Sequence, residues 1–425
     1  MALIRKTMQI KVYNFTVWLI AITLLFPLFF QLSGGIYKEA AWVMDSGGVL
    51  DSLPLPISIV TCVIGLLVFF RNVRQAVPSI LFVLAFFAVI VLSLVFSSEN
   101  VDIEYRKMIF AAQTLLPTMG LVLGQLVRDE QNAIPRAFMW VLLLVVPFQL
   151  FAGVLQNTLT LTHYLYVFTI YQHFQYVPVI FVMAYCLVMV HLYESQKPLS
   201  FFLTFVMGMY VIASASFLAI SLYIGFVLLF FLITILRFKT TRLNSFLIIG
   251  AGILAVALIM SLYFLAAKNN KIADGEKGVY YLKFQSLANG KMPTNVAERL
   301  SDWKMYGNWI GESKRTLVFG HVSPPPREIK TSPHNWYIDL SYNLGLLSLL
   351  PVLALIIFTA LLIRRFHGAL SSETWWLTGL VAFMVLVDCN FKVTLRQPYP
   401  GIFAYFLWGL LLSRLRFQPA PKLGA

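Results

Sequence analysis

Apolar segments of about 20 residues, the length of helix that crosses the hydrocarbon core of a bilayer, recur along nearly the whole sequence. The segment 77–96 is typical, because none of its residues is charged. Across all 425 residues, 59% are hydrophobic and only 12% are charged, which excludes an ordinary soluble globular domain. The sequence therefore predicts an all-α polytopic membrane protein with about 12 transmembrane helices. The expected spans are residues 13–33, 51–70, 77–96, 107–127, 134–156, 172–192, 200–215, 217–236, 244–266, 335–363, 375–391 and 399–415.

The distribution of Lys and Arg predicts which ends of these spans face the cytoplasm. If the N-terminus is cytoplasmic, the inner segments carry sixteen basic residues and the short outer loops carry five. Because short cytoplasmic loops are enriched in Lys and Arg, we expect both termini to be cytoplasmic. The long hydrophilic segment 267–334 then lies outside. Three regions follow: a membrane domain with the first nine spans (1–266), an outer loop with short helices (267–334), and a membrane domain with the last three spans (335–425).

The net charge of +14 would suggest a nucleic-acid partner in a soluble protein. Here the charge follows the loops between spans, so we expect membrane lipids as neighbours and no nucleic acid. The three cysteines, Cys62, Cys186 and Cys389, form no C-x-x-C motif and no Cys/His cluster, which argues against zinc or disulfides. The sequence contains no Gly-rich phosphate loop. It therefore predicts no metal site and no cofactor.

The outer loop contains a segment, 295–315, with the pattern of an amphipathic helix. Its apolar residues recur at about 100° per residue and form one stripe. The stripe consists of Val296, Leu300, Trp303, Tyr306 and Ile310. Arg299 falls within it, which has two interpretations. One is a snorkelling side chain or a structural ion pair. The other is an arginine that binds an anion, because the planar guanidinium donates two parallel hydrogen bonds to a phosphate group.

The dipeptide Ser332-Pro333 predicts a helix start, with serine as N-cap and proline at the first helical position. His334 and Asn335 would then occupy the first turn of the tenth span. Free N–H groups and the helix dipole favour a bound anion and a neutral imidazole there, and a neutral histidine can act as a general base. The alternative is an interfacial pair that only caps the helix. Three small residues would follow along the same face as a smooth stripe, at Ser341, Gly345 and Ser348.

About fifty residues, 299–348, carry a motif that resembles the O-antigen ligases and their polymerase relatives. In that family a His-Asn pair opens a late membrane helix after a large periplasmic loop, and nine residues separate the pair from a glycine. The matching residues are His334, Asn335 and Gly345 in this signature, and Arg299, Trp303 and Gly320 upstream of it. Ser348 departs from the signature, because ligases carry Gly, Thr or Tyr at its position.

The resemblance implies a metal-independent glycosyltransferase in the bacterial inner membrane, with its active site at the periplasmic face. The donor would be a glycan on undecaprenyl diphosphate, and the acceptor a hydroxyl of lipid A-core. His334 would be the general base, and Arg299 would stabilise the departing diphosphate, with Asn335 also contacting substrate. One alternative is an O-antigen or exopolysaccharide polymerase, for which a growing glycan is the acceptor. Another is a lipid-glycan transporter, although the spans lack the mid-membrane charges that such proteins carry.

One family feature is missing, because the region 211–223 contains no basic residue where the family has a second arginine. The residues that we expect to replace it are Arg396 and Lys392 on the last outer loop, followed by Arg106 and Lys107. His173, at the mouth of the sixth span, either contacts the substrate or packs at the membrane interface.

Overall fold

The computed structural model of the chain describes residues 2–30, 55–97, 105–127, 129, 132–155, 173–214, 216–237, 289–290, 294–323, 325 and 332–416, and every structural statement below concerns these residues. They are predominantly helical. Two short strands, β1 (Phe29–Phe30) and β2 (Leu55–Pro56), pair antiparallel, with Phe29 opposite Pro56. The predicted all-α class is confirmed at this level, and the strand pair is a small addition that the apolar pattern did not indicate.

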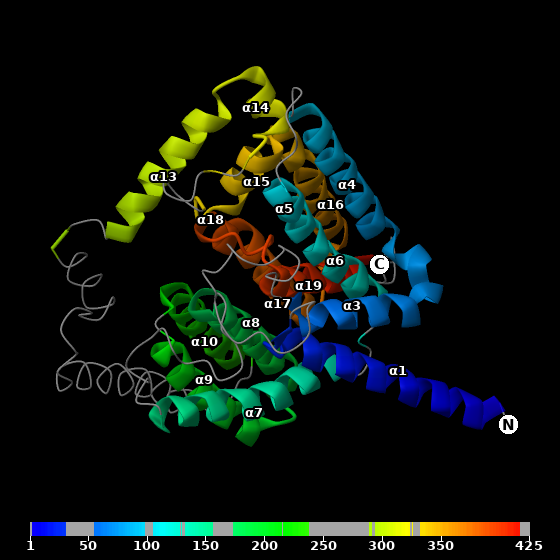
Figure 1. Ribbon diagram of the computed structural model, residues 1–425. Coiled ribbons are helices and arrows are strands. Elements are labelled where there is room, and N and C mark those ends of the chain that lie inside the picture. The colour runs from blue at the N-terminus through cyan, green and yellow to red at the C-terminus, as the bar shows by residue number, and fades with distance from the viewer. Residues whose placement is uncertain are drawn as a thin grey trace. The chain divides into compact units, whose positions relative to one another are not determined.

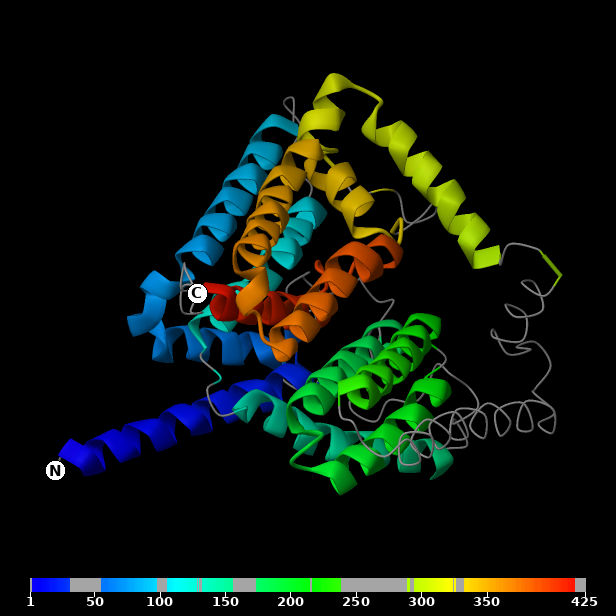
Figure 2. The same cartoon turned by 180° about the vertical axis from the view of Figure 1, so that it is seen from behind.

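The described helices form two compact units, and the first combines the N-terminal helices as far as α6 with α13–α19 (Figures 1 and 2). Besides the two strands, its elements are α1 (Ala2–Leu25), α3 (Ile57–Val68), η1 (Phe70–Ala76), α4 (Val77–Ser97), α5 (Tyr105–Leu115), η2 (Leu116–Thr118), α6 (Met119–Leu126), α13 (Thr294–Ile310), α14 (Lys314–Phe319), α15 (Trp336–Leu344), η3 (Leu346–Ser348), α16 (Leu349–Phe366), η4 (His367–Ala369), α17 (Ser372–Ala382), η5 (Phe383–Asp388), α18 (Cys389–Phe391) and α19 (Pro398–Arg416). Helices from the predicted outer loop therefore share a unit with the C-terminal helices.

The second unit is a helical bundle in which α8 packs against both α9 and α10. Its helices are α7 (Ala133–Leu155), α8 (His173–Leu192), α9 (Lys197–Ala213) and α10 (Phe217–Arg237). Tyr185 on α8 shares a hydrogen bond of 2.8 Å with Thr204 on α9, and its ring centroid lies 5.5 Å from that of Tyr223 on α10. The break between α9 and α10 falls at the predicted boundary between the seventh and eighth spans.

Five segments of the described chain are helical, long and apolar enough to cross a membrane, judged by length and composition. They are Phe70–Ser97, Lys107–Leu126, Ala133–Ala152, Leu346–Ala369 and Ser372–Phe391. Shorter apolar helices, such as Lys197–Ala213, coincide with other predicted spans. The full set of twelve stays a prediction, and the ninth span, 244–266, lies outside the described residues. The tenth predicted span, 335–363, is wrong as a single helix, because the chain turns at Gly345 and the apolar segment begins at Leu346.

A glycine contact between α6 and α19 forms the centre of the first unit. Gly120 and Gly124 lie one turn apart on α6, and a Cβ added at either would come within 2.2 Å or 2.1 Å of a carbonyl oxygen of α19. Gly409 on α19 meets the backbone of α6 in the same way. Small residues at this spacing let two helices approach closely within a membrane. As a result α19 is buried along its length except at Arg414 and Arg416.

Two further glycines fix α14 against α15. Gly320 ends α14 with φ 79°, and Gly345 ends α15 with φ 77°, a region that glycine adopts without steric cost. A Cβ on Gly320 would lie 2.6 Å from the carbonyl of Asn343, and one on Gly345 would lie 2.0 Å from the carbonyl oxygen of Val318. Because α14 also packs on α4, these contacts hold the helices around the candidate site in one place.

Candidate functional site

His334 lies in a short segment whose strained conformation is held by its neighbours. Its φ is 50°, a left-handed value that residues other than glycine rarely adopt. The indole N–H of Trp303 on α13 donates to the carbonyl of Pro333 at 3.0 Å, and the backbone N–H of His334 donates to the hydroxyl of Ser332 at 3.2 Å. Backbone strain of this kind persists where the surroundings over-determine it, and it is concentrated at functional sites.

Asn335 caps α15, which corrects the predicted helix start. Its Oδ1 accepts hydrogen bonds from the backbone N–H groups of Tyr337 and Ile338 at 3.0 Å and 3.1 Å. The helix therefore begins at Trp336, and His334 lies outside its first turn. Asparagine is as good an N-cap as serine, and the sequence pattern favoured Ser332 over Asn335, the actual cap three residues later. Since Asn335 itself occupies the free N–H groups, they no longer support a bound anion or a neutral imidazole.

The predicted stripe of small residues beneath His334 is also wrong as a helix face. The helix ends at Gly345, and Ser341 and Ser348 are both buried, with hydroxyls that donate to the carbonyls of Tyr337 and Gly345. These small residues pack inside the unit and do not form a groove.

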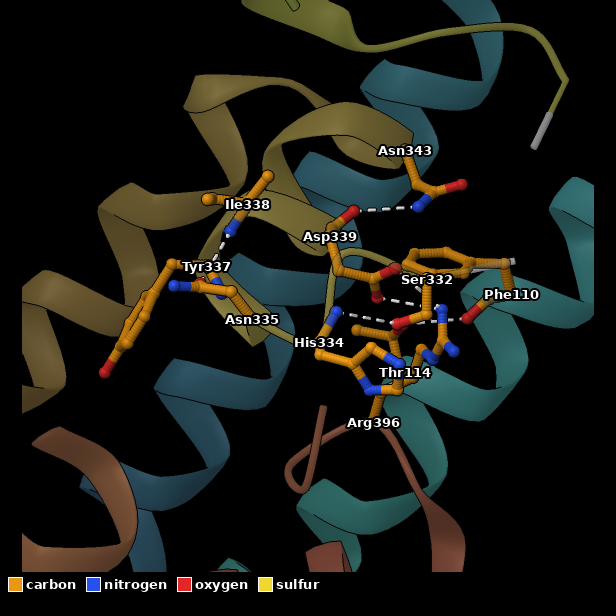
Figure 3. Close-up of polar contacts among 10 residues, drawn as sticks. All are labelled: Phe110, Thr114, Ser332, His334, Asn335, Tyr337, Ile338, Asp339, Asn343 and Arg396. Carbon is orange, nitrogen blue, oxygen red and sulfur yellow. Dashed lines mark hydrogen bonds and ion pairs between the residues drawn. The ribbon is translucent and has the colours of Figure 1, made fainter. Parts of the chain in front are cut away.

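An ion pair links α15 to the segment between α18 and α19. Nη1 of Arg396 lies 3.0 Å from Oδ1 and 2.8 Å from Oδ2 of Asp339, which is 2% exposed (Figure 3). The guanidinium carbon of Arg396 lies 4.9 Å from the centre of the Phe110 ring on α5, a cation–π distance. Burial raises the pKa of Asp339 to about 6, although the charge and the hydrogen bonds of Arg396 oppose this. Arg396, which we predicted to bind the diphosphate, thus has a counter-charge within the protein.

Lys392 begins the same segment and is almost fully buried. Its ammonium nitrogen lies 3.4 Å from Oδ1 of Asp388, whose other oxygen accepts a hydrogen bond from Thr394. Burial lowers the pKa of Lys392, the charge of Asp388 opposes this, and the charge of Arg299 adds to the lowering. The short helix α18 separates Lys392 from η5, a π-helix that ends at Asp388. π-Helical turns are rare overall, and those that occur often lie at functional sites.

Three structural links bring Arg299, His334 and Lys392 into one region of the first unit. Trp303, one turn beyond Arg299 on α13, contacts the residue that precedes His334. Nδ2 of Asn335 donates to Oδ1 of Asn390 on α18 at 3.2 Å. Asn390 precedes Lys392 by two positions, so this bond ties the start of α15 to the segment that carries Lys392. The charge of Arg299 also contributes to the lowered pKa of Lys392. The structure therefore links the segments that carry the predicted base and two predicted cations, which are α13, the residues before α15 and the residue after α18.

Only part of the apolar stripe on α13 packs against α15. Tyr306 and Ile310 are buried against α15, together with Tyr342. Val296 and Leu300, nearer the start of α13, are 41% and 46% exposed within the described structure. The amphipathic pattern therefore found the helix correctly but overstated how much of its apolar face packs.

The remaining predicted site residues lie elsewhere or are only partly described. Lys107 on α5 is buried, and its ammonium donates to the hydroxyl of Ser97 at 2.6 Å and to the carbonyl of His321 at 2.8 Å, so it joins α4, α5 and the end of α14. Arg106 belongs to α5 and His173 begins α8, but their side chains lie outside the described residues. His173 belongs to the second unit.

Sequence reasoning missed Asp339 and Asn390. A carboxylate among apolar residues is a signal that marks functional positions in membrane proteins, and Asp339 could have been found in this way. Asn390 carries no such signal, because its hydrogen bond with Asn335 joins two residues 55 positions apart in the sequence. Within the described part of the chain, no group of three or more His, Cys, Asp or Glu side chains could hold a metal ion.

Comparison with known proteins adds no identification. No protein-family model matches the chain, and no curated protein matches it.

Proposed function

We propose that this chain is a membrane glycosyltransferase that moves a glycan from undecaprenyl diphosphate onto an acceptor hydroxyl of lipid A-core. The observation that carries the proposal is the pair of hydrogen bonds, Trp303 to Pro333 and Asn335 to Asn390, that links the segments carrying Arg299, His334 and Lys392. A histidine held in a strained backbone, on a segment linked to those of two cations, suits a reaction in which a proton leaves one reactant and negative charge develops on another.

In this proposal Nδ1 or Nε2 of His334 takes the proton of the acceptor hydroxyl. The hydroxyl oxygen then attacks the anomeric carbon of the donor sugar, and the bond from that carbon to the diphosphate oxygen breaks. The diphosphate leaves with the electron pair and gains negative charge as it departs. Arg299 and Lys392 stabilise this charge. The donor is already activated, so the reaction requires no nucleotide.

The same chemistry would join lipid-linked repeat units if the acceptor were a growing glycan. Ser348 and the absence of a basic residue in 211–223 keep this polymerase as the second candidate. The reaction step and the roles of His334, Arg299 and Lys392 are identical in the two cases. Only the acceptor differs, so the products in the cell envelope distinguish them.

Deletion of the gene, followed by separation of the envelope glycans on a gel, tests the proposal. Loss of glycan-capped lipid A-core with accumulation of lipid-linked polymer would identify a ligase, and cores capped by one repeat would identify a polymerase. Complementation with the wild-type chain should restore the pattern, and complementation with His334→Gln should not. An unchanged glycan pattern in the deletion strain would refute both candidates.

A further inference from the structure

The short helix α14 exposes apolar side chains although its sequence belongs to the predicted outer loop. Leu317 and Val318, in its second half, are 37% and 38% exposed within the described structure. Lys314, its first residue, is also exposed. Single exposed apolar residues are ordinary on the surface of a soluble protein. The position of α14 relative to the membrane therefore decides what these side chains contact.

Two hydrogen bonds fix the position of α14 along α4, which forms most of the candidate span Phe70–Ser97 (Figures 1 and 2). Nε of Arg315 donates to the carbonyl of Phe96 at 2.5 Å, and the hydroxyl of Ser93 donates to the carbonyl of Phe319 at 2.5 Å. Ser93 lies about 6 Å inside the end of the span, at the rise of an α-helix. The helix α14 therefore runs from the end of this span toward its middle, and its apolar second half lies deeper.

Two other candidate spans begin beside α14. The ammonium group that opens the span Lys107–Leu126 donates to the carbonyl of His321, two residues after the end of α14. A Cβ on Gly345 would collide with the backbone of α14, and the span Leu346–Ala369 begins at the next residue. With α4, three candidate spans have an end at α14. One surface of the bilayer is therefore expected at this level.

The side chains around α14 match the two layers of such a surface. Phe96 and Leu346, at the ends of two of these spans, are exposed, so they extend the apolar surface of Leu317 and Val318. Lys314 lies at the shallow end of α14, on the side of the phosphate layer. A lysine beside apolar residues can keep its stem in the apolar layer while its ammonium group reaches the phosphates.

We propose that α14 anchors the predicted outer loop in the membrane interface. Leu317 and Val318 contact the acyl chains of the leaflet at the Ser97 end of α4, and Lys314 binds the phosphate of a phospholipid headgroup. The partner is the bilayer and not a second protein. In this arrangement the segment 267–334 does not lie wholly in water, because α14 enters the interface.

The anchor also fixes the height of the candidate site above the bilayer. The close contacts at Gly320 and Gly345 hold α14 against α15, and His334 directly precedes the cap of α15. The segment that carries His334 is thereby kept near the headgroup layer. The anchor follows from the packing of α14 alone, so it does not depend on the proposed reaction.

Depth-dependent fluorescence quenching of the full chain in nanodiscs tests the anchor. The variant Leu317→Cys carries an environment-sensitive fluorophore, and the three native cysteines are buried. The quenchers are phosphatidylcholine with a nitroxide near the glycerol end of an acyl chain, the same lipid with a nitroxide near the methyl end, and iodide in water. Leu84→Cys, an exposed position in α4, and Lys304→Cys, an exposed position on α13, are the references.

We expect the shallow nitroxide to quench Leu317→Cys more strongly than the deep nitroxide does, and iodide to quench it weakly, as for a helix at the boundary of headgroups and acyl chains. Leu84→Cys should show the opposite order of the two nitroxides. Lys304→Cys should be quenched mainly by iodide. Val318→Cys should behave like Leu317→Cys, and it keeps the test valid if Leu317→Cys fails to fold.

Lys314→Gln tests the headgroup contact. Nitroxide-labelled phosphatidylglycerol is titrated into detergent micelles that hold the labelled Leu317→Cys protein. Loss of one lysine beside an anionic headgroup should raise the lipid concentration for half-maximal quenching by about fivefold. Lys304→Gln is the matched control, because it removes an exposed lysine from α13, and it should leave the titration unchanged.

Strong quenching by iodide and weak quenching by both lipids, at Leu317 and at Val318, would place α14 in water and overturn the proposal. Protection from all three quenchers would mean that a protein surface, such as a second copy of the chain, covers α14, which also overturns it. An unchanged titration in Lys314→Gln would overturn the headgroup contact.

Discussion

Asp339 on α15 and Arg396 before α19 are 57 positions apart in the sequence, yet their side chains form a buried ion pair with contacts of 2.8 Å and 3.0 Å. Burial raises the pKa of Asp339 to about 6, with Arg396 opposing. The carboxyl group therefore holds its proton to a higher pH in the folded protein than in the unfolded chain, where an aspartate has a pKa of about 3.9.

We predict that the stability of the wild type, relative to Asp339→Asn, falls as the pH rises from about 4 to about 6. In this window the folded protein keeps a proton on Asp339 that the unfolded chain has released, so a rising pH favours unfolding. A pKa that moves from 3.8 to about 6 corresponds to about 3 kcal/mol in the free energy of unfolding. Denaturant unfolding of both proteins at several pH values in this window measures the difference in their free energies of unfolding. If the free energies of unfolding of the two proteins depend on pH in the same way, Asp339 does not titrate in this window.

Replacing His334 by Gln should reduce transfer by about 10²- to 10⁴-fold, the usual contribution of a general base. The amide keeps hydrogen bonding but cannot take a proton. An in vitro transfer assay with purified protein and lipid-linked donor measures the loss, and donor binding should be retained. His367→Gln is the control, because His367 is exposed in η4, and it should have wild-type activity. Near-full activity of His334→Gln would mean that another group is the base.

Arg299→Lys should lower transfer by about 10- to 100-fold while the melting temperature stays near the wild-type value. Lysine keeps the positive charge but loses the planar fork that binds two phosphate oxygens together. Lys304→Gln, an exposed change on the same helix, should leave transfer unaltered. If Arg299→Lys loses melting temperature and activity together, Arg299 serves the fold.

Gly345→Ala should destabilise the protein by at least about 2 kcal/mol, because alanine resists the positive φ and its Cβ would collide with α14. Gly307→Ala on α13 is the matched control. No atom lies within 4 Å of a Cβ at Gly307, so alanine should stabilise the helix by about 0.5–1 kcal/mol. Thermal unfolding in detergent measures both. Equal effects of the two changes would contradict the close contact between α14 and α15.

A cysteine at Lys304 should react with a membrane-impermeant thiol reagent on intact spheroplasts, because we expect α13 to lie outside the membrane. A cysteine at Arg365, near the other end of α16, should react only after lysis. Both positions are exposed, and the native cysteines Cys62, Cys186 and Cys389 are buried, so background labelling should be low. Labelling of the Lys304 variant only after lysis would reverse the predicted orientation and move the proposed site to the cytoplasmic side.

Much of the helical layout could be predicted from the sequence, because apolar length and helical spacing are local properties. The helix predicted within residues 295–315, observed as α13 (Thr294–Ile310), and the break between α9 and α10 both followed from such patterns. The start of α15 did not. Ser332 and Asn335 are both good caps, and the choice between them depends on contacts with α13 and α18 that no local pattern records.

The same distinction applies to the candidate site. Arg299 and His334 could be named from spacing and from the resemblance to known ligases. The partner of Arg396 could not, because the ion pair with Asp339 forms only when α15, α5 and the segment before α19 are brought together. A cation on an outer loop predicts an anion partner, but the sequence alone does not say whether that partner is a ligand or another part of the chain.

The burial of α19 has a consequence for how the protein is made. This helix leaves the ribosome after every other described helix, yet it fills the centre of the first unit, against the glycines of α6. The face of α6 that carries Gly120 and Gly124 therefore stays unpacked, in contact with lipid or a chaperone, until Arg416 has been synthesised. A chain truncated before Pro398 would insert its earlier helices without α19, the helix against which they pack. We expect membrane quality-control proteases to degrade such a chain.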